Sequence, residues 1–302
     1  AYVYRDKIFD IDYNDTKTSE LISLDIKINK TCNLSCRMCG PEISSKWANE
    51  VSQNKESYPQ FSTLSLVKNE WTDVNGSKVW KDLEEITSDL SYLTFSGGEP
   101  LLDKTHSHML QYFIDKQRSR YISIHYNTNA TIFAPNLISL WSRFKEVELS
   151  FSIDNTGKKF EYERYGVSWK TIVDTIEKYK KVTDTVLNLN VWSTITTLNV
   201  LDTYTLFQFC REYGLPISFN LLNDPKQLNI CLFNKKQKKY ITDKLLNIQD
   251  NEFQKIIEPI ITAMNSSNMS TNTTNMIDFL SITDKIRKQD YKQTYEELTY
   301  IL

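Results

Sequence analysis

The chain has 302 residues, of which 40% are hydrophobic and 25% charged, and its formal net charge at pH 7 is -2. This composition allows a substantial buried core, argues against intrinsic disorder, and makes a nucleic-acid partner an unfavoured expectation. No run of eighteen or more apolar residues occurs, so no membrane span is expected. The first fifteen residues lack the apolar core of a signal peptide, and we expect a cytoplasmic, reducing location.

Short apolar segments alternate with helical patterns through the first three-quarters of the chain. Strands are expected at residues 24–28, 92–95, 122–126, 147–153, 186–194 and 217–221. Helices are expected between them, at 105–120, 135–144, 169–181 and 201–213, with two more at 44–53 and 79–88. This alternation predicts parallel β-α units, and hence an α/β fold with an open or partial (β/α)6 barrel.

The pattern changes after about residue 234. Helices are expected at 235–248, 252–264 and 277–302, and the Asn/Ser/Thr-rich stretch 265–275 is expected as a loop. We therefore expect three parts: an N-terminal extension at 1–20, the partial barrel at 21–234, and a C-terminal helical segment at 235–302.

The cysteines are the first indication of chemistry. The chain has five, and Cys32, Cys36 and Cys39 fall within eight residues, which in a chain without a secretory signal indicates metal binding sooner than disulfides. Three thiolates can each bind a different iron of a cubic cluster and leave one iron open to an exogenous chelator. Zinc is an alternative because thiolates also select it, but it would need a further His or Cys ligand, and no paired spacing provides one.

Unusual polar residues follow the next three predicted strands. The residues concerned are Ser96, Gly97, Gly98 and Glu99 after the second strand, Asn127 and Asn129 after the third, and Ser152 and Asp154 at the end of the fourth. Because the carboxyl ends of parallel strands meet at one edge, and catalytic loops gather there, these groups are expected to share a site with the three cysteines.

The glycine pair is informative because the chain has only seven glycines. Gly97 and Gly98 directly follow an apolar strand, where they can adopt a positive φ and let the backbone approach a ligand closely. Pro100 favours an extended conformation at Glu99, whose carboxylate could then accept hydrogen bonds from an ammonium group. A simple strand-to-helix turn is the alternative for this segment taken alone.

The segments CNLSCRMC at residues 32–39 and SGGEP at residues 96–100 together resemble the radical S-adenosylmethionine (radical SAM) superfamily. The flanks at 39–41, 44–47 and 152–154 resemble its SPASM/twitch branch, and the resemblance covers roughly residues 21–225. It implies a radical SAM partial barrel with a C-terminal helical extension. Relatives in this branch usually carry further cysteines for auxiliary clusters. Here only Cys210 and Cys231 follow, and we expect both to be buried core thiols.

The resemblance implies roles for the motif residues. Cys32, Cys36 and Cys39 would ligate one [4Fe–4S] cluster, whose fourth iron is chelated by the amino and carboxylate groups of S-adenosylmethionine. The segment Ser96, Gly97, Gly98 and Glu99 would contact that amino group, with Glu99 as its charged partner.

Further positions carry weaker implied roles. Asn127 and Asn129 would lie near the cofactor, and Ser152 and Asp154 would hydrogen-bond the ribose hydroxyls. The remaining three positions are Arg164, which would face the methionine carboxylate unless it is a surface residue, Met38, which would pack beside adenine, and Asn199, which is expected to cap a helix in preference to contacting the adenosine.

The implied activity is reductive cleavage of S-adenosylmethionine and hydrogen abstraction from a substrate, with the class of enzyme, oxidoreductase or transferase, left open. A peptide or protein side chain is the expected substrate, and a nucleoside or small metabolite is the alternative. A flavodoxin or ferredoxin-type protein is the expected reductant. A non-catalytic cluster- or zinc-binding protein is the alternative of another class, disfavoured because the three cysteines, Glu99, Ser152 and Asp154 are all present.

Overall fold

The computed structural model describes residues 21–27, 29–61, 89–104, 106–182, 187–267 and 273–302. The expected extension at 1–20, the expected helix at 79–88 and Ile28 lie outside the described residues. Within them, six strands form one sheet in the spatial order β1-β3-β4-β5-β7-β8, and every neighbouring pair is parallel. Their bounds are β1 Ser23–Lys27, β3 Tyr92–Ser96, β4 Ser123–Thr128, β5 Glu146–Ser152, β7 Leu187–Ile195 and β8 Ile217–Leu221.

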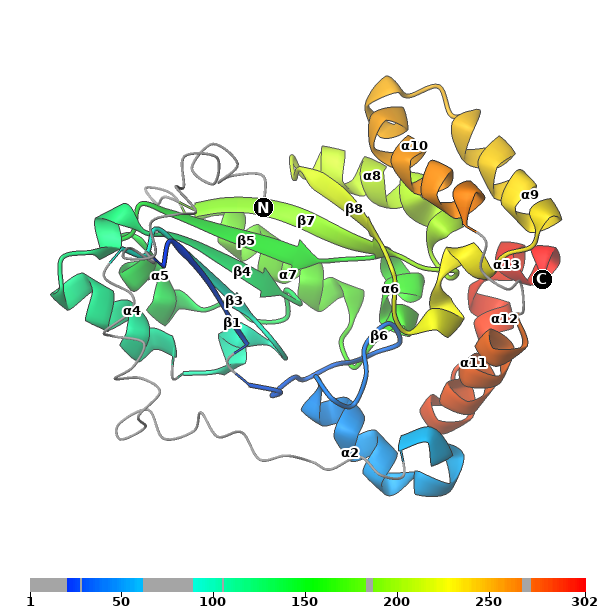
Figure 1. Ribbon diagram of the computed structural model, residues 1–302, viewed down its shortest axis with the longest axis horizontal. Coiled ribbons are helices and arrows are strands. Elements are labelled where there is room, and N and C mark those ends of the chain that lie inside the picture. Colours follow the sequence, from blue (N-terminus) through cyan, green and yellow to red (C-terminus); the bar gives the residue numbers. More distant parts are fainter. Residues whose placement is uncertain (1–20, 28, 62–88, 105, 183–186, 268–272) are drawn as a thin grey trace, which may run out of the picture.

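Helices follow the strands as the alternation predicts. They are α4 His106–Asp115, α5 Pro135–Trp141, α7 Trp169–Lys180 and α8 Thr203–Glu212. Figure 1 shows the curved sheet with its strands in sequential order and further helices gathered beyond one end. The prediction of an α/β fold with a parallel, partial (β/α)6 barrel and a helical C-terminal region is therefore confirmed.

The two faces of the sheet differ in chemistry because successive strand residues point to opposite sides. Leu93, Tyr126 and Leu149 lie on the face that packs against α4, α5, α7 and α8, and they belong to the first hydrophobic core. The opposite face carries polar residues. They are Asp25, Thr94, Ser96, His125, Asn127, Glu148, Ser150, Ser152, Asn190, Thr194, Ser218 and Asn220. This polar face is free of the helices named above and positions side chains toward the inside of the partial barrel.

A second, two-stranded sheet was not predicted. Its antiparallel strands β2 (Ser35–Cys36) and β6 (Arg164–Tyr165) pair Cys36 with Arg164, and α6 (Gly157–Glu163) precedes β6. Strands of two residues carry no periodic pattern that a sequence could reveal. Their pairing brings the three-cysteine loop against a segment well over a hundred residues further along the chain.

The C-terminal helices form a second core with the three-cysteine loop. They are α9 Lys235–Leu246, α10 Asn251–Ser266, α11 Thr274–Arg287, α12 Tyr291–Thr294 and α13 Glu296–Ile301. Their buried side chains cluster with Leu34, Met38 and Trp47, the last of which lies on α2 (Ser45–Gln53). Accordingly, α2 lies beside α11 in Figure 1.

The prediction of one continuous helix at 277–302 is wrong. Helix α11 ends at Arg287 because Lys288 adopts a left-handed conformation with φ 54° and ψ 47°. Asp290 then caps α12, its side chain accepting a hydrogen bond from the backbone N–H of Lys292 at 2.8 Å. The Asp side chain thus competes with a continuous helical ladder and starts a new helix instead.

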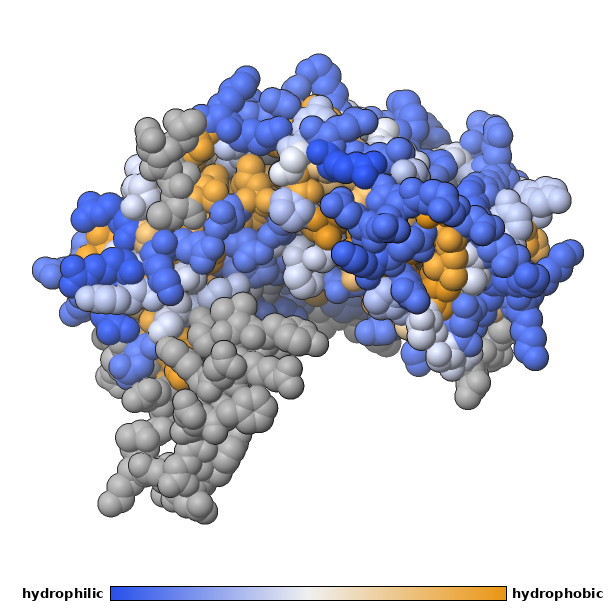
Figure 2. All heavy atoms as spheres, turned by 90° about the horizontal axis from the view of Figure 1, so that it is seen from above, coloured by the Kyte–Doolittle hydropathy of each residue, from blue (hydrophilic) through white to orange (hydrophobic). Residues whose placement is uncertain are grey.

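The surface is largely hydrophilic. In Figure 2 hydrophobic side chains form a band across the middle of the face seen, with a smaller group toward the C-terminal helices. Among the described residues, no helix combines the length and apolarity needed to cross a membrane.

Candidate metal and cofactor site

The three-cysteine loop follows β1 at the carboxyl edge of the sheet. Cys36 is buried in β2, and Cys32 and Cys39 are half-buried. The loop is tightly turned, because the backbone N–H of Cys39 donates to the carbonyl of Cys36 at 3.1 Å. All three cysteines carry free thiols, so each is available as a metal ligand.

Two side chains donate toward these sulfurs. Asn129 Nδ2 lies 3.8 Å from Cys32 Sγ, and Arg164 Nη1 lies 3.8 Å from Cys36 Sγ. Arg164 is oriented by Asp154, whose Oδ2 accepts from both Nε and Nη2 at 2.7 Å. A buried guanidinium beside thiols favours their ionised form, which is the form that binds metal.

The thiols differ in acidity. A hydrogen bond with Cys36 lowers the pKa of Cys39, and the same bond, followed by burial, raises the pKa of Cys36. Burial raises the pKa of Cys32. Arg164 acts to lower the pKa of both Cys36 and Cys39, so ionisation of this pair is opposed by burial and assisted by a fixed positive charge.

The donor set fits a polynuclear cluster. Among the described residues, no three His, Cys, Asp or Glu side chains converge closely enough to hold a single metal ion. A cubic cluster makes a different demand, since each thiolate binds a separate iron at a separate corner. Three free thiols on one loop, two of them facing side-chain donors, suit iron–sulfur ligation, where hydrogen bonds to sulfur tune the metal.

The segment after the cysteines braces their loop. Ser44 caps α2 and donates to the carbonyl of Leu34 at 2.6 Å, while Ser45 Oγ accepts from the N–H of Cys32 at 3.1 Å. Lys46 Nζ donates to the carbonyl of Asn33 at 3.0 Å, and Trp47 Nε1 donates to that of Cys36 at 2.6 Å. Each residue of this tetrapeptide therefore fixes the loop's backbone. The segment at residues 44–47 therefore has a physical role in holding the cysteine loop in place.

The glycine pair contacts the same loop. Gly97 adopts the predicted positive φ, at 115°. A Cβ on Gly98 would lie 2.3 Å from the carbonyl oxygen of Thr31, closer than real carbon atoms approach. The N–H of Gly98 donates to Asn29 and that of Glu99 to Thr31, at 2.9 and 2.8 Å. Because Gly98 has no side chain, the glycine turn and the three-cysteine loop can meet. The close approach that we expected for a ligand is made here by the backbone of the cysteine loop.

Glu99 is fully buried at the junction of β3 and β4. Its carboxylate accepts from Thr128 Oγ1 at 2.7 Å and from the N–H groups of Asn129 and Leu101 at 2.6 and 3.1 Å. Burial raises the pKa of Glu99 to about 7, against these hydrogen bonds, which lower it. Glu99 therefore locks the turn of residues 96–99 to Asn129, and a nearby ammonium group would favour its ionised form.

The other expected site residues lie at the same edge or close to it. Ser96 Oγ donates to Asp25 at 2.8 Å, and Asn127 and Ser152 lie at or next to the carboxyl ends of neighbouring strands on the polar face. Met38 is buried in the second core. Asp154 Oδ1 accepts from the backbone N–H of Thr194 at 2.7 Å, so both of its oxygens already hold donors. The cofactor contacts that we expect of these residues stay predictions.

Asn199 does not cap the helix that follows it. Its Nδ2 donates to the carbonyl of Thr194 at 2.9 Å and to Glu163 at 3.1 Å. Glu163 is fully buried and also accepts from Asn155 at 2.9 Å and Tyr295 at 2.7 Å. Burial, followed by nearby Asp154, raises the pKa of Glu163 to about 8. The expectation of a cap was wrong because these buried partners, remote in sequence, take the side chain.

Sequence reasoning also missed Arg37, although it lies inside the cysteine motif. Its side chain is fully buried and ion-paired to Asp284 at 2.7 Å. The one available signal was a charged residue between two predicted cluster ligands. Nothing in the sequence indicated a partner almost 250 residues away.

Comparisons with known proteins agree with this geometry. The model of the family described as "Radical SAM superfamily" matches residues 26–207, more than half of the chain. The chain is similar to anSMEcpe with bound AdoMet, at 17% identity and a TM-score of 0.51 over 74% of this chain and 58% of that one. The complex of anSMEcpe with AdoMet and the Cp18Cys peptide gives 17% identity and a TM-score of 0.50 over the same shares.

A third similar structure is SuiB of Streptococcus suis bound to S-adenosylmethionine, at 14% identity and a TM-score of 0.49 over 82% of this chain and 49% of that one. The chain thus spans little more than half the length of anSMEcpe and about half that of SuiB. No curated protein matches the sequence.

The family match covers the end of β1, the three-cysteine loop, the glycine turn and the strands through β7. The similar structures share the fold of this region. The chain therefore belongs to the radical SAM superfamily of enzymes, whose cofactors are S-adenosylmethionine and a [4Fe–4S] cluster.

Proposed function

We propose that this chain is a radical SAM enzyme that abstracts hydrogen from a peptide or protein side chain. The observation that carries the proposal is the three-cysteine loop itself. Two of its three free thiols, those of Cys32 and Cys36, face donors from Asn129 and Arg164, and the loop backbone is in contact with the glycine turn at Gly98. One edge of the sheet thus joins a thiolate donor set to the turn expected to receive the cofactor's amino group.

Cys32, Cys36 and Cys39 would hold the cluster. When bound, the cluster and S-adenosylmethionine supply a 5′-deoxyadenosyl radical that takes a hydrogen atom from the substrate. The turn of residues 96–99 would receive the amino group, with the negative charge of Glu99 behind it. Arg164, fixed by Asp154, would balance the charge of the thiolates and face the carboxylate.

Ser152, Asn127 and Asn129 would line the nucleoside end of the same edge, and Met38 would supply an apolar contact for adenine. The protein's task here is to orient the reacting atoms and exclude water, since an unselective radical must meet only its substrate. We identify no residue as a direct catalytic acid or base.

The polar face of the sheet suits a peptide. It presents carboxylates on Asp25, Glu146 and Glu148. His125 lies between Asp25 and Glu148, close enough to interact electrostatically with both. Trp192, at 41% exposed, offers a flat apolar surface on the same face. Amides and hydroxyls can pair with a peptide backbone, and the carboxylates favour a cationic side chain. The peptide complex of anSMEcpe gives the proposal further support.

The finer branch assignment is also part of the proposal. Cys210 is fully buried in the first core, where burial raises its pKa to about 12, and Cys231 is buried beside the second core. Each stands apart in the sequence from the other cysteines. We therefore assign no auxiliary cluster to this chain, and the SPASM/twitch-like branch rests on the segments at 39–41, 44–47 and 152–154. A flavodoxin or ferredoxin-type protein would supply the electron.

The test begins with anaerobically reconstituted protein. Iron and sulfide are measured, dithionite and S-adenosylmethionine are added, and 5′-deoxyadenosine is quantified. We expect product from the wild type and from Cys210→Ser, a matched cysteine control, and none from Cys36→Ala. Tetrahedral zinc in place of iron, or a full cluster with no cleavage in any condition, would refute the proposal.

The substrate class needs a second assay. Unstructured peptides rich in Lys or Arg are compared with counterparts carrying Gln at those positions. We expect the basic peptides to stimulate 5′-deoxyadenosine formation more strongly, and deuterium from labelled peptide to appear in the product. Stimulation by nucleosides and by no peptide would favour the alternative substrate class.

A further inference from the structure

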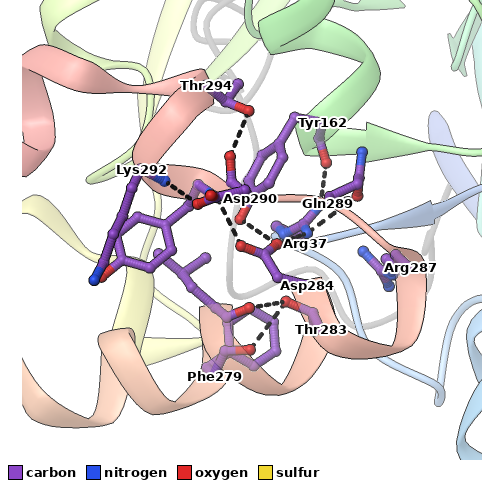
Figure 3. Close-up of polar contacts among 12 residues, drawn as sticks. Arg37, Tyr162, Phe279, Thr283, Asp284, Arg287, Gln289, Asp290, Lys292 and Thr294 are labelled. Carbon is purple, nitrogen blue, oxygen red and sulfur yellow. Dashed lines mark hydrogen bonds and ion pairs between the residues drawn. The ribbon is translucent and has the colours of Figure 1, made fainter.

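Arg37 connects the cysteine motif to the C-terminal helices. Its guanidinium carbon lies 3.5 Å from the centroid of the Tyr162 ring, a cation–π contact at short range. Its Nη2 donates to Asp284 Oδ1 at 2.7 Å, and both terminal nitrogens lie close to Gln289 Oε1, at 3.1 and 3.2 Å. Figure 3 shows Asp284 of α11, Gln289 of the segment after it and Tyr162 of α6 grouped around Arg37.

Asp284 is itself fully engaged. Oδ1 also accepts from the Tyr162 hydroxyl at 2.8 Å, and Oδ2 accepts from the backbone N–H of Tyr291 at 2.7 Å. The Asp284 side chain is only 10% exposed and that of Arg37 is fully buried. A buried charge pair is costly to break, because removing one partner leaves the other charge buried and unpaired. The pair therefore holds the loop in one place, although Arg37 Nε has no hydrogen-bond partner among the described residues.

Arg287, at the last turn of α11, makes a second connection. It forms a fork with Glu50 of α2, with Nε to Oε2 and Nη2 to Oε1 both at 3.0 Å. Its guanidinium also lies 4.8 Å from the Trp47 ring and 4.9 Å from the Tyr165 ring. Trp47 in turn donates to the carbonyl of Cys36 at 2.6 Å. Helix α11 therefore contacts α2, whose Trp47 bonds to the carbonyl of Cys36, and β6, which pairs with Cys36.

We propose that Asp284 and Arg287 of α11 are positioning residues for the three-cysteine loop, so that the C-terminal helices set how firmly the cluster is retained. The inference rests on the proposed function, because it requires that the cysteines hold a cluster. Asp284 also balances the charge of Arg37, which lies between Cys36 and Cys39. Removing that balance leaves an unpaired buried cation on the residue that follows Cys36, and added positive charge favours the reduced, more negative state of a cluster held by this loop.

Two variants separate geometry from charge. Asp284→Asn keeps the side-chain shape and removes the negative charge. Arg287→Lys keeps the charge and removes the planar fork that Glu50, Trp47 and Tyr165 require. Glu297→Gln is the control, because it breaks a C-terminal ion pair with Lys244 on α9 that does not touch the loop.

The readouts are the rate at which a ferrous chelator removes iron from the anaerobic protein, and the reduction potential of the cluster. We expect iron loss to be about tenfold faster than wild type in Asp284→Asn and Arg287→Lys, with Glu297→Gln unchanged. We expect a more positive potential only in Asp284→Asn. If that variant does not fold, Tyr162→Phe replaces it, with a smaller increase in iron loss, because it removes one hydrogen bond to Asp284 and keeps the ring under Arg37.

The outcomes are distinguishable. Wild-type iron loss and potential in folded variants would overturn this inference, and so would equally fast loss from Glu297→Gln, since a general loosening of the helices would then suffice. In both cases S-adenosylmethionine cleavage by the wild type would leave the proposed function standing. Absence of iron and sulfide from the wild type would overturn the proposed function and this inference with it.

Discussion

The three-cysteine loop is held on two sides by contacts of different kinds. On the barrel side backbone hydrogen bonds join the loop to the glycine turn, with Gly98 donating to Asn29 and Glu99 to Thr31, and there is no room for a side chain at Gly98. The Asn129 side chain adds contacts to Cys32 and Asn33 on this side. On the other side the contacts are between charged and aromatic side chains, centred on Arg37 and Asp284.

The difference shows how one loop can serve two demands. Backbone contacts at Gly98 depend on the geometry of the strand edge and fix where the loop meets the expected cofactor turn. Side-chain contacts at Arg37 depend on a remote helix and decide how firmly the loop stays there. The apolar residues Leu34 and Met38 belong to the core shared with the C-terminal helices. Substitutions on the two sides of the loop should therefore have different effects on stability and on cluster retention.

The largest effect on stability is expected where the two sides meet, at the Asp154–Arg164 pair. Asp154→Asn leaves Arg164 buried beside Cys36 without its counter-charge, and should lower the free energy of unfolding by about 3–5 kcal/mol. Urea unfolding of the metal-free protein measures this. Arg211→Gln, which breaks an ion pair between Asp250 and a half-exposed arginine, should have a much smaller effect because water screens that pair. Equal effects of the two variants would contradict the account.

Glu163 provides a pH-dependent test of the contacts with the C-terminal helices, because it accepts a hydrogen bond from Tyr295. Its pKa is about 8 in the fold against a usual 4.5. Below pH 4.5 both folded and unfolded states hold the proton. As pH rises toward 8 only the unfolded state loses it, so stability falls across this window, by roughly 2–4 kcal/mol. Above about pH 8 the loss levels off.

Glu163→Gln should remove that contribution. Urea midpoints at pH 5 and pH 8 should differ less in the variant than in the wild type, because all other titrating groups are common to both. The same pH dependence in both proteins would show that Glu163 titrates normally in the fold.

Gly98→Ala breaks the barrel side alone. A Cβ there would meet the backbone of Thr31 and force the loops apart, which should cost about 2–3 kcal/mol and reduce cluster retention about tenfold. Gly214→Ala is the control, because Gly214 also has a positive φ, of 64°, but has nothing within 4 Å of the added Cβ. It should cost about 1 kcal/mol and leave cluster retention unchanged. Normal retention in Gly98→Ala would refute the close contact.

The smallest expected effect concerns the contacts between the cysteine loop and the C-terminal helices. A double-mutant cycle of Arg37→Gln and Asp284→Asn should give a coupling free energy of about 1–2 kcal/mol in the metal-free protein, because the two charges share one buried network. Additive effects would show that the pair is not energetically coupled. In that case the helices would act on the loop through packing alone.

The sequence predicted the barrel side well and the other side poorly. Alternation of apolar residues located all six strands of the parallel sheet, and the loops after them carried the chemistry that placed Gly98 and Glu99 at one edge. Local patterns encode such features, because a strand and its following turn are adjacent in the chain. The pairing of Arg37 with Asp284 joins residues far apart in the chain, which no local pattern encodes. The break of α11 at Lys288, after which Gln289 and Tyr291 join the same network, was concealed by a continuous helical pattern.

The central claim is that Cys32, Cys36 and Cys39 hold a cluster with one iron open to the methionine end of S-adenosylmethionine. The most direct measurement is electron–nuclear double resonance on the dithionite-reduced protein with cofactor labelled with ¹⁵N at its amino group. We expect a cluster signal that changes when the cofactor is added and a resolved ¹⁵N coupling, both absent from Cys36→Ala. A cluster signal that is indifferent to the cofactor and shows no ¹⁵N coupling would contradict it.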